Sequence, residues 1–140
     1  AAMSRDLQPV EGVRDVLDGL AGPKCVASNG EPDKMRHSLG LTGLRDYFGD
    51  ALFSAAQVAR GKPHPDLFLH AAREMGVEPS QAVVVEDSLP GVQGARAAGM
   101  RVFGYAPGAG QDADRWRAEM HAAGANVFVC MADLPVMLRD

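Results

Sequence analysis

Short apolar runs alternate with helical patterns along the chain. The runs are rich in Val, Phe or Ala and bounded by turn residues. They lie at Cys25 to Ala27, Ala51 to Ser54, Ala82 to Val85, Arg101 to Gly104 and Asn126 to Val129. Val83-Val84-Val85 is continuous rather than alternating, which is the pattern of a strand buried on both faces. We therefore expect each run to form a short strand.

The segments between the runs repeat apolar residues at the three-and-four spacing of one helical face. Helices are predicted over Gly12 to Leu20, Asp33 to Leu39, Pro65 to Met75, Leu89 to Ala98 and Asp112 to Ala123. A glycine follows three of them, at Gly76, Gly99 and Gly124, where helices commonly end. Strands that alternate with single helices predict an α/β layer fold with a parallel sheet, and the length predicts one domain over residues 1–140.

Composition excludes several classes of partner. The net charge is −4, the pI is about 5.5, and no basic stripe is present, so nucleic acid and anionic membranes are not expected partners. No apolar run approaches the roughly 18 residues that span a bilayer, and no signal-peptide pattern opens the chain. Cys25 and Cys130 lie in apolar runs, which indicates buried free thiols in a reducing cytoplasm.

In an open α/β sheet, ligands bind beyond the carboxyl ends of the strands. The first run leads into Ser28-Asn29-Gly30, which offers a hydroxyl, an amide and a close backbone approach. A predicted helix follows, and its free N–H groups favour an anion at this turn. The alternative is an ordinary strand-to-helix turn that Ser or Asn caps.

A lysine follows the second run, in the segment Gly61-Lys62-Pro63-His64-Pro65-Asp66. Pro63 bars Lys62 from helical geometry, and a lysine fixed in this way suits phosphate binding. The alternative is a solvated lysine in a proline-rich turn. His64, between two prolines, is interpreted as a turn residue or a contact at the substrate rim rather than a base.

Two adjacent carboxylates, Glu86 and Asp87, follow the third run directly. At the end of a buried strand they would repel each other and lose hydration, and a bound cation relieves both problems. Oxygen ligands without a nearby histidine or thiolate favour magnesium over zinc. The alternative is a helix N-terminus, where acidic residues are favourable anyway. Downstream, Gly91, Gly94 and Gly99 are not spaced as a dinucleotide fingerprint, and close helix packing explains them better.

These elements resemble the haloacid dehalogenase superfamily, in particular its β-phosphoglucomutase-like phosphatases. Three segments carry the resemblance in the family's order: CVASNG at 25–30, GKPHPDLF at 61–68 and VVVEDSLPGVQGARAAGM at 83–100. Residues 7–13 are similar to the segment that leads into the core after the cap domain. CVASNG followed by Lys34, Met35, His37 and Ser38 resembles bacterial sugar-acid phosphatases that hydrolyse 6-phosphogluconate.

The resemblance implies a three-layer Rossmann-like core and a role for each candidate residue. Ser28 and Asn29 would bind phosphate, Lys62 would be the phosphate-binding catalytic lysine, and Asp87, helped by Glu86, would hold Mg²⁺. The implied reaction is the hydrolysis of a small phosphate monoester, a sugar or sugar-acid phosphate, through an aspartyl-phosphate.

The family's first motif, DxDGT, is absent from the 140 residues, and so is the helical cap. The resemblance implies that the strand carrying this motif, with its nucleophilic and acid–base aspartates, lies at the centre of the sheet between the strands ending at Ser28 and Glu86. We expect that segment to precede Ala1 and to complete the sheet.

Three other functions remain open. A phosphomutase uses the same core but returns the phosphate to the sugar. A haloacid dehalogenase attacks carbon and needs no metal, against which the Glu86-Asp87 pair argues. The chain could also be a non-catalytic fragment or a binding module.

Overall fold

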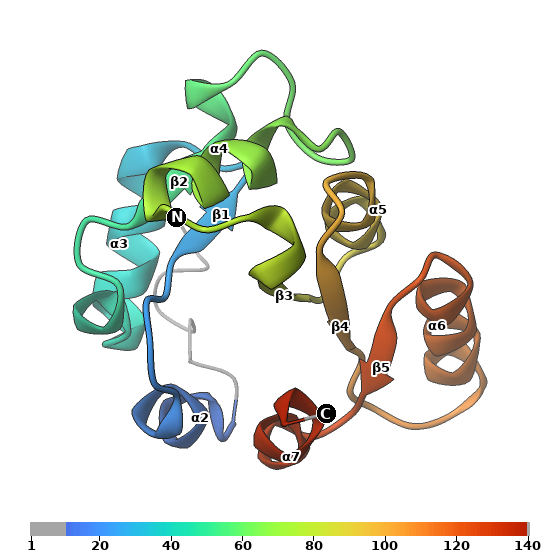
Figure 1. Cartoon of the computed structure of the whole chain (residues 1–140). Coiled ribbons are helices and arrows are strands. Elements are labelled where there is room, and N and C mark those ends of the chain that lie inside the picture. The colour runs from blue at the N-terminus through green and yellow to red at the C-terminus, as the bar shows by residue number, and fades with distance from the viewer. Residues whose placement is uncertain (1–10, 140) are drawn as a thin grey trace.

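The computed structural model describes residues 11–139, in which strands and helices alternate (Figure 1). The strands are β1 (Val26–Ser28), β2 (Leu52–Ser54), β3 (Val83–Glu86), β4 (Arg101–Tyr105) and β5 (Asn126–Phe128). The α-helices are α2 (Val13–Gly19), α3 (Pro32–Thr42), α4 (Asp66–Met75), α5 (Leu89–Ala97), α6 (Gln111–Ala122) and α7 (Leu134–Leu138). Short 3₁₀ helices form at η1 (Arg45–Tyr47), η2 (Ala55–Gln57), η3 (Pro79–Gln81) and η4 (Met131–Asp133). All predicted strands and helices are present with small shifts at their ends. Residues 7–10, the start of the segment that resembles the lead into the core, lie outside the described residues.

The strands pair in parallel, as predicted, but in two sheets. β1 pairs with β2, with Ala27 opposite Phe53, and β3, β4 and β5 form a second sheet in that order, with Val85 opposite Phe103. Between residues 11 and 139, no strand pairs with both β1 and β3. Within these residues, β1 and β3 are therefore not joined by the further strand that the resemblance implies between them.

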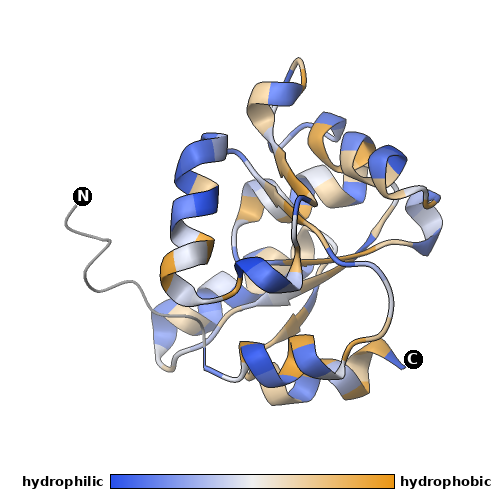
Figure 2. Cartoon of the chain, turned by 90° about the vertical axis from the view of Figure 1, so that its left-hand side faces the viewer, coloured by the Kyte–Doolittle hydropathy of each residue, from blue (hydrophilic) through white to orange (hydrophobic). Residues whose placement is uncertain are grey.

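Helices cover the sheets in two layers. α4, α5 and α6 lie along one side, and α2, α3 and α7 lie along the other (Figure 1). Apolar residues gather on the strands, while the helices carry hydrophilic residues on part of their surface (Figure 2). Within residues 11–139, none of the helices is long and apolar enough to cross a bilayer.

The helices beside the sheet ends are terminated by local chemistry. Ser88 precedes α5, and its hydroxyl accepts a hydrogen bond from the Gly91 N–H at 3.2 Å, which caps the helix. α4 ends at Gly76, whose φ of 71° favours glycine. Gly99 and Gly124 also have positive φ, which confirms the three predicted helix ends.

The prediction that Val83-Val84-Val85 is buried on both faces is wrong. Val84 packs against the core of α5, α6 and β4, but Val83 and Val85 are 40% and 42% exposed. Because side chains alternate along a strand, Val83 and Val85 point to the opposite face from Val84. On that face, no described helix covers β3.

The cysteines are free thiols, as predicted, but they are not both buried. Cys25 is half-buried just before β1, and burial raises the pKa of its thiol. Cys130 is exposed, because it lies just beyond the end of β5 rather than within the strand. Val129 and Cys130 follow the last residue of β5, Phe128, and both are exposed.

Candidate active site

Lys62 lies in the loop between η2 and α4, and its side chain is only 11% exposed. Its ammonium group donates a hydrogen bond to the Ala27 carbonyl oxygen of β1 at 2.9 Å. It also donates to Glu86 Oε2 of β3 at 2.5 Å, so it bridges the two sheets. The ammonium lies 5.3 Å from the centre of the Phe68 ring. These contacts do not fit the alternative of a solvated lysine.

Glu86 ends β3 with its side chain 9% exposed, and both its carboxylate oxygens are engaged. Oε2 accepts the hydrogen bond from Lys62, and Oε1 accepts one from the Ser88 hydroxyl at 3.0 Å. A Cβ atom at Gly91 would lie 2.0 Å from this carboxylate, so only glycine leaves room for it. A buried charge of this kind is stable when it is paired and hydrogen-bonded, and Glu86 is both.

Asp87 follows Glu86 directly but is exposed. Within residues 11–139, no hydrogen bond or ion pair engages its carboxylate, in contrast to Glu86. An accessible carboxylate at a strand end fits a hard cation such as Mg²⁺, which prefers oxygen ligands. The described part of the chain has no group of three or more His, Cys, Asp or Glu side chains placed to hold a metal ion. Further ligands for an ion at Asp87 would come from water, substrate or other residues.

Ser28 and Asn29 end β1 close to the Lys62 loop. The Ser28 hydroxyl accepts a hydrogen bond from the Gly30 N–H at 2.9 Å. The Asn29 amide engages the main chain of Lys62: Oδ1 accepts from the Lys62 N–H at 2.9 Å, and Nδ2 donates to the Lys62 carbonyl at 3.2 Å. The turn after β1 and the loop after β2 are therefore tied together.

The structure adds residues that the sequence analysis missed. Ser54, at the end of β2, is 1% exposed, and its hydroxyl donates to the Gly30 carbonyl at 2.6 Å. Ser88 supports Glu86 and caps α5 with one hydroxyl. The position of Ser88 two residues before Pro90 is a helix-start signal that could have found it.

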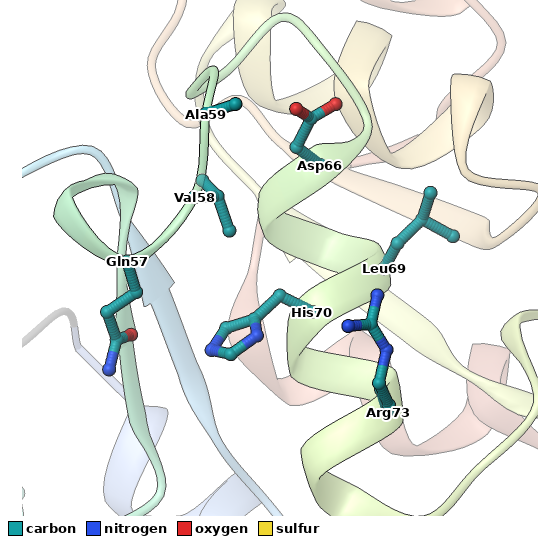
Figure 3. A pocket seen from close by; sticks show the side chains of 7 residues that line it. All are labelled: Gln57, Val58, Ala59, Asp66, Leu69, His70 and Arg73. Atoms are coloured by element: carbon teal, nitrogen blue, oxygen red, sulfur yellow. The ribbon is translucent and has the colours of Figure 1, made fainter.

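A separate hollow of about 290 Å³ lies between η2 and α4 (Figure 3). It contains none of the predicted site residues. It is lined by Gln57, Val58, Ala59, Asp66, Leu69, His70 and Arg73. Asp66 is paired with Arg60, and the His70 ring packs edge-on against Phe53 with the ring centres 5.5 Å apart. Asp66 and His70 thus already have partners within the fold, and the strand ends remain the candidate site.

The candidate residues thus lie at the ends of β1 and β3 and in the loop that follows β2 and η2: Ser28, Lys62, Glu86 and Asp87. The side chains of Lys62 and Glu86 touch, and Asn29 touches the Lys62 main chain. The arrangement offers donors for an anion beside an accessible carboxylate for a cation. This is the polarity that a phosphate group with a divalent cation needs.

Comparison with known proteins gives one family. The family described as haloacid dehalogenase-like hydrolase matches residues 2–99. The chain is 42% identical over 98 residues to the 6-phosphogluconate phosphatase of Escherichia coli (strain K12), a match that covers 70% of the chain and 44% of that protein. The chain therefore spans less than half of this relative.

Solved structures share the fold. A conserved haloacid dehalogenase-like protein of unknown function from Agrobacterium tumefaciens superposes with a TM-score of 0.89 at 39% identity, covering 98% of this chain and 63% of that chain. A haloacid dehalogenase family hydrolase from Deinococcus radiodurans, solved with bound phosphate and sodium, superposes with a TM-score of 0.83 at 32% identity, covering 92% and 58%. The predicted Rossmann-like core is confirmed.

Proposed function

The chain belongs to the haloacid dehalogenase-like hydrolases, and from that premise we propose that it forms most of the core of a magnesium-dependent phosphatase. The substrate is a small phosphate monoester, a sugar or sugar-acid phosphate. The name of the 6-phosphogluconate phosphatase relative supports this substrate class. Residues 1–140 then act as one core domain in the cytoplasm of a bacterium.

The observation that carries this proposal is the fixed ammonium group of Lys62. A lysine has three N–H donors, and two of them are taken by Ala27 and Glu86. Among residues 11–139 no acceptor takes the third, which would donate to a non-bridging phosphate oxygen. Ser28 supplies a hydroxyl donor from the neighbouring strand end, and together they stabilise the negative charge of the phosphoryl group as it is transferred.

Asp87 is the residue of this chain that would hold Mg²⁺. A bound Mg²⁺ ion offsets the repulsion between an attacking carboxylate and the phosphate. The negative charge of Glu86, which is adjacent to Asp87, is balanced by the Lys62 ammonium group. Glu86 in turn sets the position of that ammonium group. We assign Glu86 a supporting role at the metal, as the sequence analysis predicted.

A further strand would lie between β1 and β3 and supply the nucleophile. Among residues 11–139, the edge of β1 away from β2 and the edge of β3 away from β4 pair with no strand, and this supports the placement because an unpaired edge leaves backbone N–H and C=O groups without partners. We call this chain together with that strand the completed core, whether as one polypeptide or as two pieces.

The reaction then proceeds in two displacements. An aspartate oxygen of the added strand bonds to phosphorus as the bond to the substrate oxygen breaks, and a second aspartate protonates the leaving alcohol. That aspartate next takes a proton from water, whose oxygen bonds to phosphorus as the bond between phosphorus and the aspartyl oxygen breaks, which releases inorganic phosphate. The attacking aspartate is thereby restored as a free carboxylate.

The direct test is phosphate release by the completed core from a panel of sugar phosphates, with and without Mg²⁺. We expect hydrolysis that EDTA abolishes, and we expect Asp87→Asn to need much more Mg²⁺ than the wild type. Asp46→Asn, which changes an exposed aspartate in η1, is the matched control. Formation of an isomeric sugar phosphate without phosphate release would favour the phosphomutase, and halide release from a haloacid that survives EDTA would favour the dehalogenase. No turnover of any substrate would support a non-catalytic role.

A further inference from the structure

The amide of Asn29 holds one residue, Lys62, at both of its main-chain polar atoms. The Lys62 N–H donates to Oδ1 at 2.9 Å, and the Lys62 carbonyl accepts from Nδ2 at 3.2 Å. A side chain that binds the N–H and the carbonyl of the same residue fixes the position of that peptide segment on both sides. The sequence analysis interpreted Asn29 as a phosphate ligand, but these contacts point elsewhere.

Gly61 gives a second, independent sign of this contact. A Cβ atom at Gly61 would lie 2.5 Å from Asn29 Oδ1 and 2.9 Å from the Ala55 Cβ, both closer than real Cβ contacts. Gly61 is not among the glycines with positive φ, so its backbone conformation does not require glycine. The close approach to the Asn29 amide and Ala55 explains why this position lacks a side chain.

Asn29 is itself held by its neighbours on both sides. The preceding residue, Ser28, accepts a hydrogen bond from the Gly30 N–H at 2.9 Å. The buried Ser54 donates to the Gly30 carbonyl at 2.6 Å. A series of contacts thus runs from the end of β2 through the turn after β1 to the lysine loop.

We propose that Asn29 is a positioning residue. It sets the position of the Lys62 ammonium group by holding the Lys62 main chain and does not bind the substrate itself. The proposal rests on the proposed function, because it assigns Lys62 to the phosphate. It predicts that the effect of Asn29 on turnover passes entirely through Lys62. A direct phosphate ligand would act independently of Lys62.

A double-mutant cycle in the completed core separates the two roles. We expect Asn29→Ala to lower kcat/KM by roughly tenfold, the effect of losing one or two hydrogen bonds. In the Lys62→Ala background, the same change should alter kcat/KM by less than about twofold. If the two losses multiply instead, Asn29 contacts the substrate and the proposal is wrong.

Two further variants provide an intermediate case and a control. Asn29→Asp retains the acceptor for the Lys62 N–H but loses the donor to its carbonyl, so its activity should lie between those of the wild type and Asn29→Ala. Asn126→Ala removes the other asparagine of the chain, exposed at the start of β5, and should leave kcat/KM unchanged.

Amide hydrogen exchange at Lys62 provides a readout that does not depend on turnover. Exchange should be faster in Asn29→Ala than in the wild type, because the N–H loses its acceptor, while Asn29→Asp should retain protection. Equal exchange rates in all three proteins would overturn the proposal even if no substrate is hydrolysed. Absence of wild-type turnover with the expected exchange pattern would refute the proposed function alone.

Discussion

The two sheets differ in how completely their residues are buried. Around β3, β4 and β5, Val92, Ala95 and Met120 are 0% exposed and Val102 is 1% exposed. Around β1 and β2 the buried cluster is smaller, consisting of Phe53, Leu67 and Ala71 with partly buried neighbours. Every residue of β1 is half-buried. The three-stranded sheet therefore packs against a large buried cluster on one face, although Val83 and Val85 of its inner strand β3 are exposed on the other, whereas the two-stranded sheet packs against a smaller cluster.

The candidate site draws on both regions. Ser28, Asn29 and Lys62 belong to the two-stranded region, whereas Glu86 and Asp87 belong to the three-stranded region. Lys62 joins them through its contacts with Ala27 and Glu86. The candidate phosphate and metal ligands therefore come from two regions that differ in packing, and the contacts of Lys62 hold these regions in position relative to each other.

The largest effect is expected when the bridge is broken with Lys62→Ala. Turnover by the completed core should fall by about 10²- to 10³-fold, since a fixed charge-stabilising donor is lost. The free energy of unfolding should also fall by about 3–5 kcal/mol, because Glu86 is left buried without its counter-ion. Steady-state kinetics and urea unfolding measure the two effects. Lys34→Ala, at an exposed position in α3, should change neither, and wild-type turnover in Lys62→Ala would refute the assigned role.

Core truncations should show that the two regions are separate. Leu67→Ala and Met120→Ala each remove a fully buried side chain, one from each cluster, and should cost about 2–5 kcal/mol of unfolding free energy. In Leu67→Ala, hydrogen exchange should accelerate at β1 and β2 while β4 stays protected, as expected for local opening of the weaker region. Uniform acceleration along the chain would show instead that the sheets open as one unit.

Two helix glycines give opposite predictions. Gly91→Ala would place a methyl group against the Glu86 carboxylate, so we expect a loss of about 1–3 kcal/mol in unfolding free energy together with reduced turnover. Gly40→Ala, in α3, meets no atom within 4 Å and should gain about 0.5–1 kcal/mol. Thermal unfolding of both variants measures the difference. A neutral Gly91→Ala would mean that Glu86 moves aside without loss.

The smallest effect concerns Asp66 in the two-stranded region. The hydrogen bond from Arg60 lowers the pKa of this carboxyl below its usual value, so the folded state favours the charged form. Asp66→Asn should therefore lower stability slightly at neutral pH. The difference from the wild type should shrink as the pH falls through the lowered pKa, where Asp66 itself becomes neutral. Urea unfolding across that pH range is the measurement, and a difference that grows in acid would contradict the assignment.

Much of the fold could be predicted because it depends on local patterns. Each strand is a short apolar run. Gly76, Gly99 and Gly124 mark helix ends that depend only on residues nearby in the sequence. The meeting of Lys62 with Glu86 could also be anticipated, since parallel strands bring their carboxyl ends to one edge. Helix α7 was missed because Leu134–Leu138 is too short to show a helical period and carries a proline near its start.

The remaining features depend on packing across long sequence separations. The exposure of Val83 and Val85 depends on whether another element covers their face of β3. The residues of the strand itself do not show this. The tie from Asn29 to Lys62 spans 33 residues, and no local pattern marks it. Gly91 was interpreted as a packing glycine, but that it packs against Glu86 emerged only with the fold.

The two thiols offer a practical way to observe the alignment of the sheets. Cys25 adjoins β1 and Cys130 adjoins β5, so each sheet carries one of the chain's two sulfur nucleophiles. Cys130 is exposed, whereas the raised pKa of Cys25 leaves less of its reactive thiolate at neutral pH. A maleimide dye at neutral pH should therefore label Cys130 first, and a second dye at higher pH should label Cys25. Energy transfer between the two dyes would then report whether the sheets keep a fixed separation or drift apart in solution.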